Sequence, residues 1–197
     1  YILDPRFETI GCAVKVDDGP STWVDGPDFG AWLSQFDPAE CTTVTFNALF
    51  DNCILAWKYG FVPSRMYCSM RMAAALHGHK LSSVSLANVG AYLQVGSKGH
   101  AIIHAKGKRR SDLMADPYQW QSYKDYAIND NNMNAAIFDR LIPDFPEAER
   151  RVMDRVLRAA VEPRFMIDKD MLRKHLADME AEHQATMQAI ANHVGCP

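Results

Sequence analysis

The sequence lacks the features that mark several large classes of protein. Five cysteines among 197 residues are an odd number and form no Cys-x-x-Cys pair, which argues against a disulfide framework or a zinc knuckle. No apolar run reaches the roughly 18 residues of a membrane-spanning helix, and the first residues show no basic-then-apolar signal pattern. We therefore expect a reducing, cytoplasmic compartment and no membrane partner.

The sequence also lacks an excess of positive charge. Lys and Arg number 21 against 24 Asp and Glu, which gives a formal net charge of −3 and argues against a protein that coats nucleic acid by bulk charge. An enzyme acting on nucleic acid stays possible, because an acidic metal pocket and a local basic strip cancel in the total. With 48% hydrophobic residues, the chain has the composition of a globular domain with at most an appendage.

The pattern of apolar and turn-forming residues predicts an α/β fold. Residues 9–16 and 22–24 flank a turn cluster and predict a hairpin, and residues 42–46 predict a buried strand. That last strand leads directly into a segment of helical period, which Gly60 and Pro63 end. We expect further helices over 28–36, 66–75, 84–93 (capped by Ser82 or Ser83), 117–141, 147–161 and 169–193, and no strand after about residue 70.

The first of two acidic patterns follows the 42–46 strand. It reads Asn47-Ala48-Leu49-Phe50-Asp51 and places Asp51 in the first turn of a helix, where the helix dipole favours a carboxylate. A carboxylate there faces the end of the sheet, which suits a catalytic or metal-binding role. The alternative is an acid that only stabilises the start of the helix.

The second pattern is Tyr126-Ala127-Ile128-Asn129-Asp130, inside the long helix expected over 117–141. Residues four apart share a helical face, so the Tyr126 hydroxyl and the Asp130 carboxylate can point into one pocket. The alternative is a half-buried tyrosine beside a solvated aspartate.

In this order the two patterns resemble the DEDDy 3′–5′ exonucleases of the ribonuclease H-like (DnaQ-like) superfamily, whose second motif sets Asn before a Phe/Tyr-Asp pair and whose third is Tyr-x-x-x-Asp. The likeness extends to the proofreading domain at the front of bacteriophage family A DNA polymerases. It is carried there by segments such as DPRFE, FNALFDNCILAWKYG, MRMAAALHG and GKRRSDL, and by a tail that looks like a connector, FPEAERRVMDRVLRAAVEPRFMIDKDML.

The resemblance implies a ribonuclease H-like mixed sheet flanked by helices, with an exonuclease-like domain over 1–142 and a helical connector over 143–197 toward a polymerase domain in cis or in trans. It implies a metal-dependent enzyme that removes nucleotides from single-stranded or frayed 3′ DNA ends, as in proofreading. Two Mg²⁺ or Mn²⁺ ions would be held by carboxylates, Asp51 and Asp130 among them, and Tyr126 would orient the attacking water. An RNA strand is a further candidate substrate.

The family's first motif, Asp-x-Glu on the first strand, is missing from the start of the sequence. Asp4 and Glu8 cannot both replace it at one metal pair, since four residues along a strand span about 13 Å; Glu8 alone, just before the strand, is an alternative as a single ligand. The only Asp-x-Glu near either end begins at Asp178, in the last predicted helix. The resemblance therefore implies that the first strand precedes Tyr1. The alternative is a catalytically incomplete module of the same fold that binds single-stranded DNA or supports a polymerase structurally.

One basic cluster stands out, between residues 96 and 110. Lys106, Lys108 and Arg109 lie in it, and we expect them to contact phosphates, which lysine and arginine do without reading sequence. The alternative is a solvated loop. Asn47 and Phe50 are further candidates for contact with nucleic acid, Phe50 by stacking on a base at a frayed end; the alternative for Phe50 is core packing.

Overall fold

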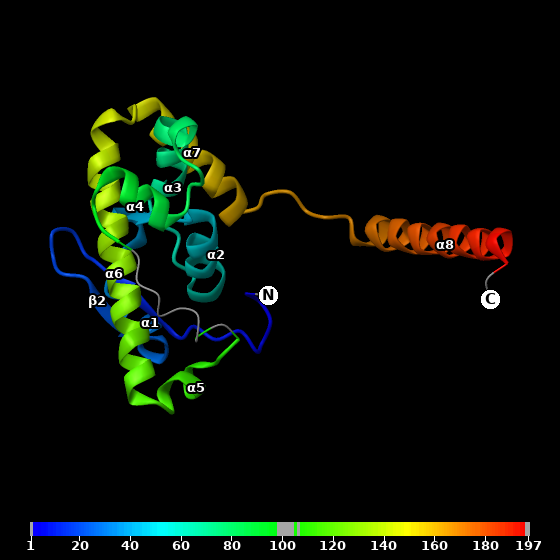
Figure 1. The fold of residues 1–197 in the computed structure, drawn as a ribbon, viewed down its shortest axis with the longest axis horizontal. Helices are drawn as coiled ribbons and strands as arrows, with labels where there is room; N and C mark the ends of the chain where they lie inside the picture. The colour runs from blue at the N-terminus through cyan, green and yellow to red at the C-terminus, as the bar shows by residue number, and fades with distance from the viewer. Residues whose placement is uncertain (1, 98–104, 106, 196–197) are drawn as a thin grey trace. The chain divides into compact units, whose positions relative to one another are not determined.

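The computed structural model describes residues 2–97, 105 and 107–195 and divides into two compact units, residues 1–162 and 163–197 (Figure 1). Each unit is described by itself. The first unit holds two small sheets and most of the helices. The elements are β1 (Gly11–Val14), β2 (Thr22–Asp25), α1 (Gly26–Leu33), η1 (Pro38–Glu40), β3 (Thr42–Thr45), α2 (Ala48–Tyr59), β4 (Arg65–Cys68), α3 (Ser69–His77), η2 (Gly78–Lys80), α4 (Leu86–Leu93), α5 (Arg110–Met114), α6 (Pro117–Leu141), η4 (Ile142–Asp144), α7 (Glu147–Val161) and α8 (Lys169–Val194).

The described strands form two separate pairs. β1 and β2 are antiparallel, with Gly11 opposite Asp25, and they form the hairpin that the sequence predicts. β3 and β4 are parallel, with Thr42 opposite Arg65. The α/β class is thus confirmed, as two sheets of two strands each within the described residues and not as one continuous sheet.

The prediction of a helix over 66–75 is wrong in its first part. Residues 65–68 form β4, and helix α3 begins only at Ser69. The whole segment is apolar, and such a run does not by itself distinguish a buried strand from a buried helix. Pairing with β3 decides the outcome, because Met66, Tyr67 and Cys68 are all buried.

The predicted cap of the helix over 84–93 also needs correction. Ser85, and not Ser82 or Ser83, caps α4, because its hydroxyl accepts a hydrogen bond from the Asn88 amide at 3.3 Å. Ser82 and Ser83 instead accept bonds from the Asn88 side chain at 3.1 and 2.8 Å. All three serines therefore serve the start of this helix.

Other helix limits agree closely with the sequence because strong local signals set them. Helix α2 ends where Gly60 adopts a left-handed conformation with φ of 67°, which glycine tolerates best. Helix α6 starts at Pro117, preceded by Asp116, whose carboxylate accepts bonds from the Tyr118 and Gln119 amides.

The main core of the first unit lies between the β3–β4 pair and the helices around it, and Ile137, Leu141 and Leu157 are its most deeply buried aliphatic residues. Helix α7 packs against α2 and β4 and contributes Leu157 and Val161. The first compact unit accordingly extends to Glu162, so α7, which we expected in the connector, packs with the residues that precede it.

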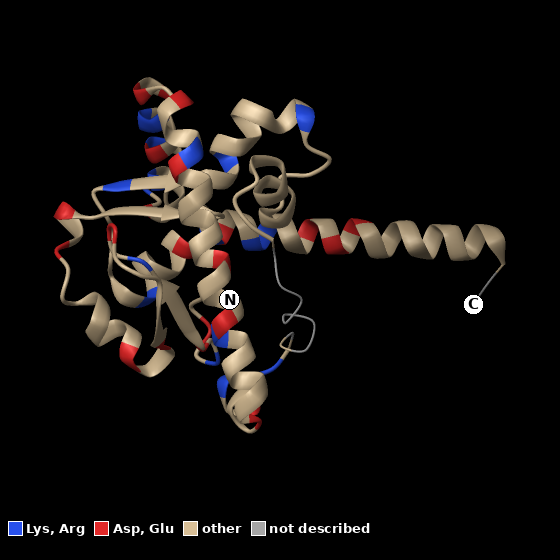
Figure 2. Cartoon of the chain, turned by 60° about the vertical axis from the view of Figure 1, so that its left-hand side comes forward, with Lys and Arg blue, Asp and Glu red and all other residues tan. Residues whose placement is uncertain are grey.

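The second unit consists of α8 and the segment before it. Asp168 caps the helix through bonds from the Asp170 and Met171 amides, and Gly195 ends it in a left-handed conformation. Its Lys, Arg, Asp and Glu residues are confined to the first half, up to Glu182 (Figure 2). No residue of α8 is buried. Among the described helices, including this one, none has the length and apolar content needed to cross a bilayer.

Candidate functional site

Asp51 lies in the first turn of α2, immediately after β3, as the sequence predicts. Its side chain is half-buried. Burial raises the pKa of the Asp51 carboxyl from 3.8 to about 6, and the neighbouring Thr45 hydroxyl, at the end of β3, opposes that rise. A carboxyl of this kind is costly to keep charged, which is common at functional sites.

The surroundings of Asp51 include the hairpin as well as β3. Burial, together with the nearby charge of Asp51, raises the pKa of the Cys12 thiol to about 12. Cys12 belongs to β1, so the Asp51 carboxyl lies close to the middle of that strand. The surroundings of Asp51 therefore include β1 of the hairpin as well as β3.

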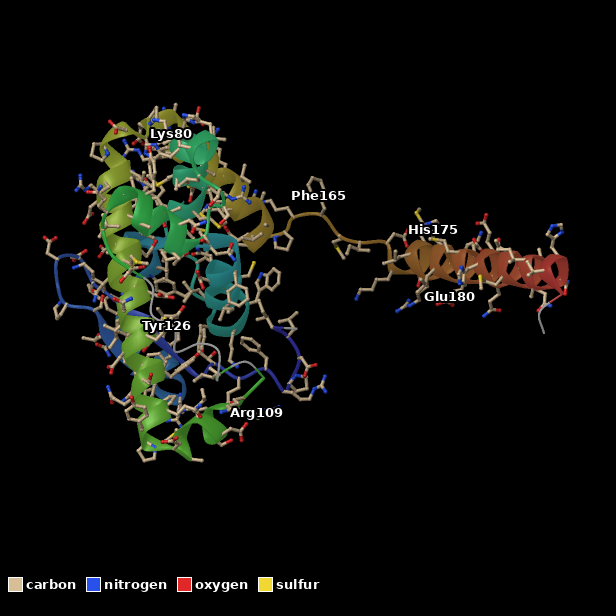
Figure 3. All side chains as sticks on the ribbon, in the orientation of Figure 1. Lys80, Arg109, Tyr126, Phe165, His175 and Glu180 are labelled. Carbon is tan, nitrogen blue, oxygen red and sulfur yellow. The ribbon has the colours of Figure 1, made fainter. Side chains whose placement is uncertain are left out.

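Tyr126 and Asp130 lie one turn apart on α6, a 25-residue helix that packs against β1, β2 and β3 (Figure 3 labels Tyr126). Tyr126 is buried, and one carboxylate oxygen of Asp130 is buried as well. One turn further along the same face, the Asn134 side chain donates to the Val44 carbonyl of β3 at 3.2 Å. This bond ties α6 to β3 one turn after Asp130.

A buried polar network around β3 was not predicted from the sequence. Asn134 also pairs with the Ser69 hydroxyl at the start of α3, and Ser69 donates to the Thr45 carbonyl at 3.4 Å. Asn52, the residue after Asp51, accepts from the Thr43 hydroxyl at 2.8 Å and donates to the Ala48 carbonyl at 2.8 Å. The network ties α2, α3 and α6 to β3 and so positions both aspartates. The sequence signal for this network was the position of Asn134, four residues after Asp130, which places the two side chains on one face of the predicted helix.

The strands next to Asp51 are less covered than β4. Within the described residues, β1 pairs only with β2, and β3 only with β4, so each has one edge without a strand partner. All four residues of β1 and three of the four in β3 are half-buried, whereas three of the four in β4 are buried. Helix α6 packs on both β1 and β3.

Asn47 and Phe50 are exposed, so a nucleic-acid strand could reach their side chains. Asn47 precedes α2, its side chain makes no capping hydrogen bond, and its carbonyl accepts from the Phe50 amide at 3.0 Å. Phe50 is 47% exposed, so it is not a core residue. Both lie within one helical turn of Asp51.

The predicted basic residues are only partly described. Lys106 lies outside the described residues. The Lys108 ammonium donates to the Gln119 side chain at 3.0 Å. Arg109, labelled in Figure 3, donates to the Arg6 carbonyl at 3.5 Å and lies 3.9 Å from the Glu8 carboxylate. These contacts hold Arg109 against the N-terminal segment while more than half of its side chain stays exposed.

Metal-ligating side chains are sparse in the part of the chain that the structure describes. No three His, Cys, Asp or Glu side chains there gather into a group that could hold a metal ion. The four cysteines among the described residues are free thiols. Asp51 and Asp130 carry carboxylate oxygens, the kind of donor that Mg²⁺ and Mn²⁺ prefer.

Comparison with known proteins returned no match to a family model, to a curated protein or to a solved structure. The function is therefore argued from the site.

Proposed function

We propose that these residues form the larger part of a metal-dependent 3′–5′ exonuclease module that removes nucleotides from single-stranded or frayed 3′ DNA ends, as in proofreading for a polymerase domain in cis or in trans. The observation that carries the proposal is Asp51. Its carboxyl is half-buried at a helix N-terminus, its pKa is raised to about 6, and it lies beside strand edges that lack a partner among the described residues. Burial makes this carboxyl costly to ionise in the folded chain.

The donor chemistry fits a divalent cation. Mg²⁺ and Mn²⁺ prefer carboxylate oxygens, and a nearby cation would favour the ionised form of Asp51 and lower its pKa. Asp51 and Asp130 are the residues that would hold the metal. When bound, the cations supply the charge that activates a water and stabilises the leaving 3′ oxygen.

The remaining ligands would come from an extended segment that carries Asp-x-Glu, outside these 197 residues. The unpaired edges of β1 and β3 support this part of the proposal, because a strand placed there would complete the backbone hydrogen bonds of both sheets and cover their half-exposed residues. Its alternate side chains would emerge on the face that Asp51 occupies.

The chain's own residues have the following roles in the proposal. Asp51 of α2 and Asp130 of α6 bind the metal. The buried Tyr126 hydroxyl, one turn from Asp130, orients the attacking water. Asn134 holds α6 in place through β3. Phe50 and Asn47, exposed beside Asp51, contact the last nucleotides of the strand.

The decisive experiment uses 5′-labelled single-stranded DNA and Mn²⁺, with the chain alone and with the chain extended at its N-terminus by a strand that carries Asp-x-Glu. We expect a 3′-to-5′ ladder from the extended protein, lost in Asp51→Asn and Asp130→Asn and when the added acids are replaced by Asn and Gln. A folded extended protein that leaves the DNA intact would refute the exonuclease.

A second candidate is a non-catalytic module of the same fold, which binds the strand or supports a polymerase. It is favoured by the absence of a third metal-ligating side chain near Asp51 and Asp130 in the described residues. This candidate predicts that the extended protein binds single-stranded DNA without cutting it.

A further inference from the structure

A groove of about 350 Å³ lies between the N-terminal segment, the start of α1 and the end of α2. Three cationic side chains line it, from three separate parts of the chain: Arg6, Lys58 and Arg109. Among the described residues that line it, Glu8 is the only acidic one. We refer to it as the basic groove.

Two of the three cations named for the basic groove, Lys58 and Arg109, donate to backbone carbonyls. The Lys58 ammonium donates to the Phe7 carbonyl at 2.9 Å and lies 4.8 Å from the centre of the Phe7 ring. Arg109 donates to the Arg6 carbonyl at 3.5 Å. A carbonyl orients a cation without neutralising its charge, so the groove keeps a positive potential despite the chain's net charge of −3.

The acids near the groove offset only part of this charge. Asp4 forms a bidentate pair with Arg6, with distances of 2.9 and 2.8 Å, and Glu8 lies 3.9 Å from Arg109. In each pair at least one of the two side chains is largely exposed, so solvent screens the attraction between the charges. Among the described residues, no carboxylate forms an ion pair with Lys58.

The basic groove and Asp51 both lie along helix α2. Lys58 lies seven residues after Asp51 on α2, which places both on one helical face about 10 Å apart along the axis. The N-terminal segment follows the same helix in the opposite direction, because Phe7 contacts Lys58, Thr9 bonds to Tyr59 at 2.7 Å and Cys12 lies near Asp51.

We infer that the basic groove binds the phosphodiester backbone of single-stranded DNA and leads its 3′ end toward Asp51. The inference rests on the proposed function for its direction and adds Lys58 and Arg6 to the strand-binding residues. Lysine and arginine bind phosphates without reading sequence, so the groove is expected to accept any base.

The test is fluorescence anisotropy of a labelled oligo-dT in EDTA, measured over a range of salt concentrations. We expect Lys58→Gln to weaken binding several-fold. The slope of log K against log salt, which is negative, is expected to become shallower by about 0.7. Lys58→Arg keeps the charge and is expected to retain the wild-type slope. Glu8→Gln removes the groove's one acid and is expected to tighten binding about twofold.

The matched control is Lys80→Gln, since Lys80 is an exposed lysine at the opposite end of the first unit from Arg109 (Figure 3). It is expected to bind like the wild type. The inference is overturned if the wild type does not bind, if Lys58→Gln keeps the wild-type slope, or if Lys58→Arg loses as much as Lys58→Gln, which would indicate a structural role through Phe7.

The experiment separates the groove from the exonuclease. Because EDTA removes divalent metal, binding is measured without cleavage. Groove-dependent binding by an extended protein that never cuts DNA would refute only the proposed exonuclease. Cleavage by an extended protein whose Lys58→Gln variant binds normally would refute only the groove.

Discussion

The two strands of the parallel sheet differ in what lies along their outer edges. At β4 the outward amides of Met66 and Cys68 bond to the Asp154 carboxylate and the Met153 sulfur of α7, at 2.9 and 3.1 Å. At β3 the Val44 carbonyl is met by a single side chain, Asn134. The β4 edge is covered by a helix and its residues are buried, whereas β3 stays half-exposed. Because Asp51 directly follows β3, the candidate site lies beside the strand whose residues stay partly exposed.

The largest expected change in the free energy of unfolding comes from a substitution in α7, the helix that covers the β4 edge. Leu157 of α7 is 1% exposed in the main core, so Leu157→Ala is expected to lower the free energy of unfolding by about 3 kcal/mol. Urea denaturation measures it. Val156→Ala, at a position 56% exposed on the same helix, is expected to change it by less than about 0.5 kcal/mol. Equal losses in both variants would show that α7 does not close this edge.

The next effect concerns the uncovered side and has the opposite sign. The pKa of Asp51 is higher in the folded chain, at about 6, than its ordinary value of 3.8, so the folded state loses stability as the pH rises from about 4 through 6. Asp51→Asn removes this penalty and is expected to stabilise the chain by about 2 kcal/mol at pH 7.5.

Urea denaturation of the Asp51→Asn variant at two pH values checks this sign. Below pH 4 the wild-type carboxyl is protonated in the folded chain, so the variant and the wild type are expected to unfold at nearly the same urea concentration. A variant that is less stable than the wild type at pH 7.5 would mean that Asp51 serves the fold and not a site.

The smallest effect tests the polar part of the covered edge. Asp154 accepts from the Met66 amide at 2.9 Å and lies 3.3 Å from Arg158, so Asp154→Ala is expected to cost about 1 to 2 kcal/mol. The matched variant is Asp170→Ala, whose ion pair with Arg173 is largely exposed and is expected to matter little. If the two variants lose the same stability, the bond to β4 contributes nothing.

Sequence alone predicted those parts of the fold that local chemistry determines. Gly60 and Pro117 set the limits of α2 and α6, and Asp51 was placed in its helical turn because the preceding strand and the change of period were both clear. Tyr126 and Asp130 followed from helical spacing. Each of these signals lies within a few residues of the feature that it predicts.

The remainder depended on contacts between distant residues. β4 is a strand because it pairs with β3, and α7 joins the first unit because Asp154 and Met153 reach the β4 amides. In the sequence, nothing distinguishes Lys58 from any other lysine in the last turn of a helix. Only the fold brings it to the Phe7 carbonyl, 51 residues away. No local pattern could have indicated that contact.

Taken by itself, the second unit has a spectroscopic consequence, because α8 is its one described helix and buries no residue. Within its own unit such a helix is stabilised by its caps and local pairs, so it melts gradually, whereas a packed unit unfolds cooperatively. All four tryptophans, Trp23, Trp32, Trp57 and Trp120, belong to the first unit. On heating, tryptophan fluorescence should therefore report one sharp transition of residues 1–162, while far-ultraviolet circular dichroism should add to it a broad slope from α8.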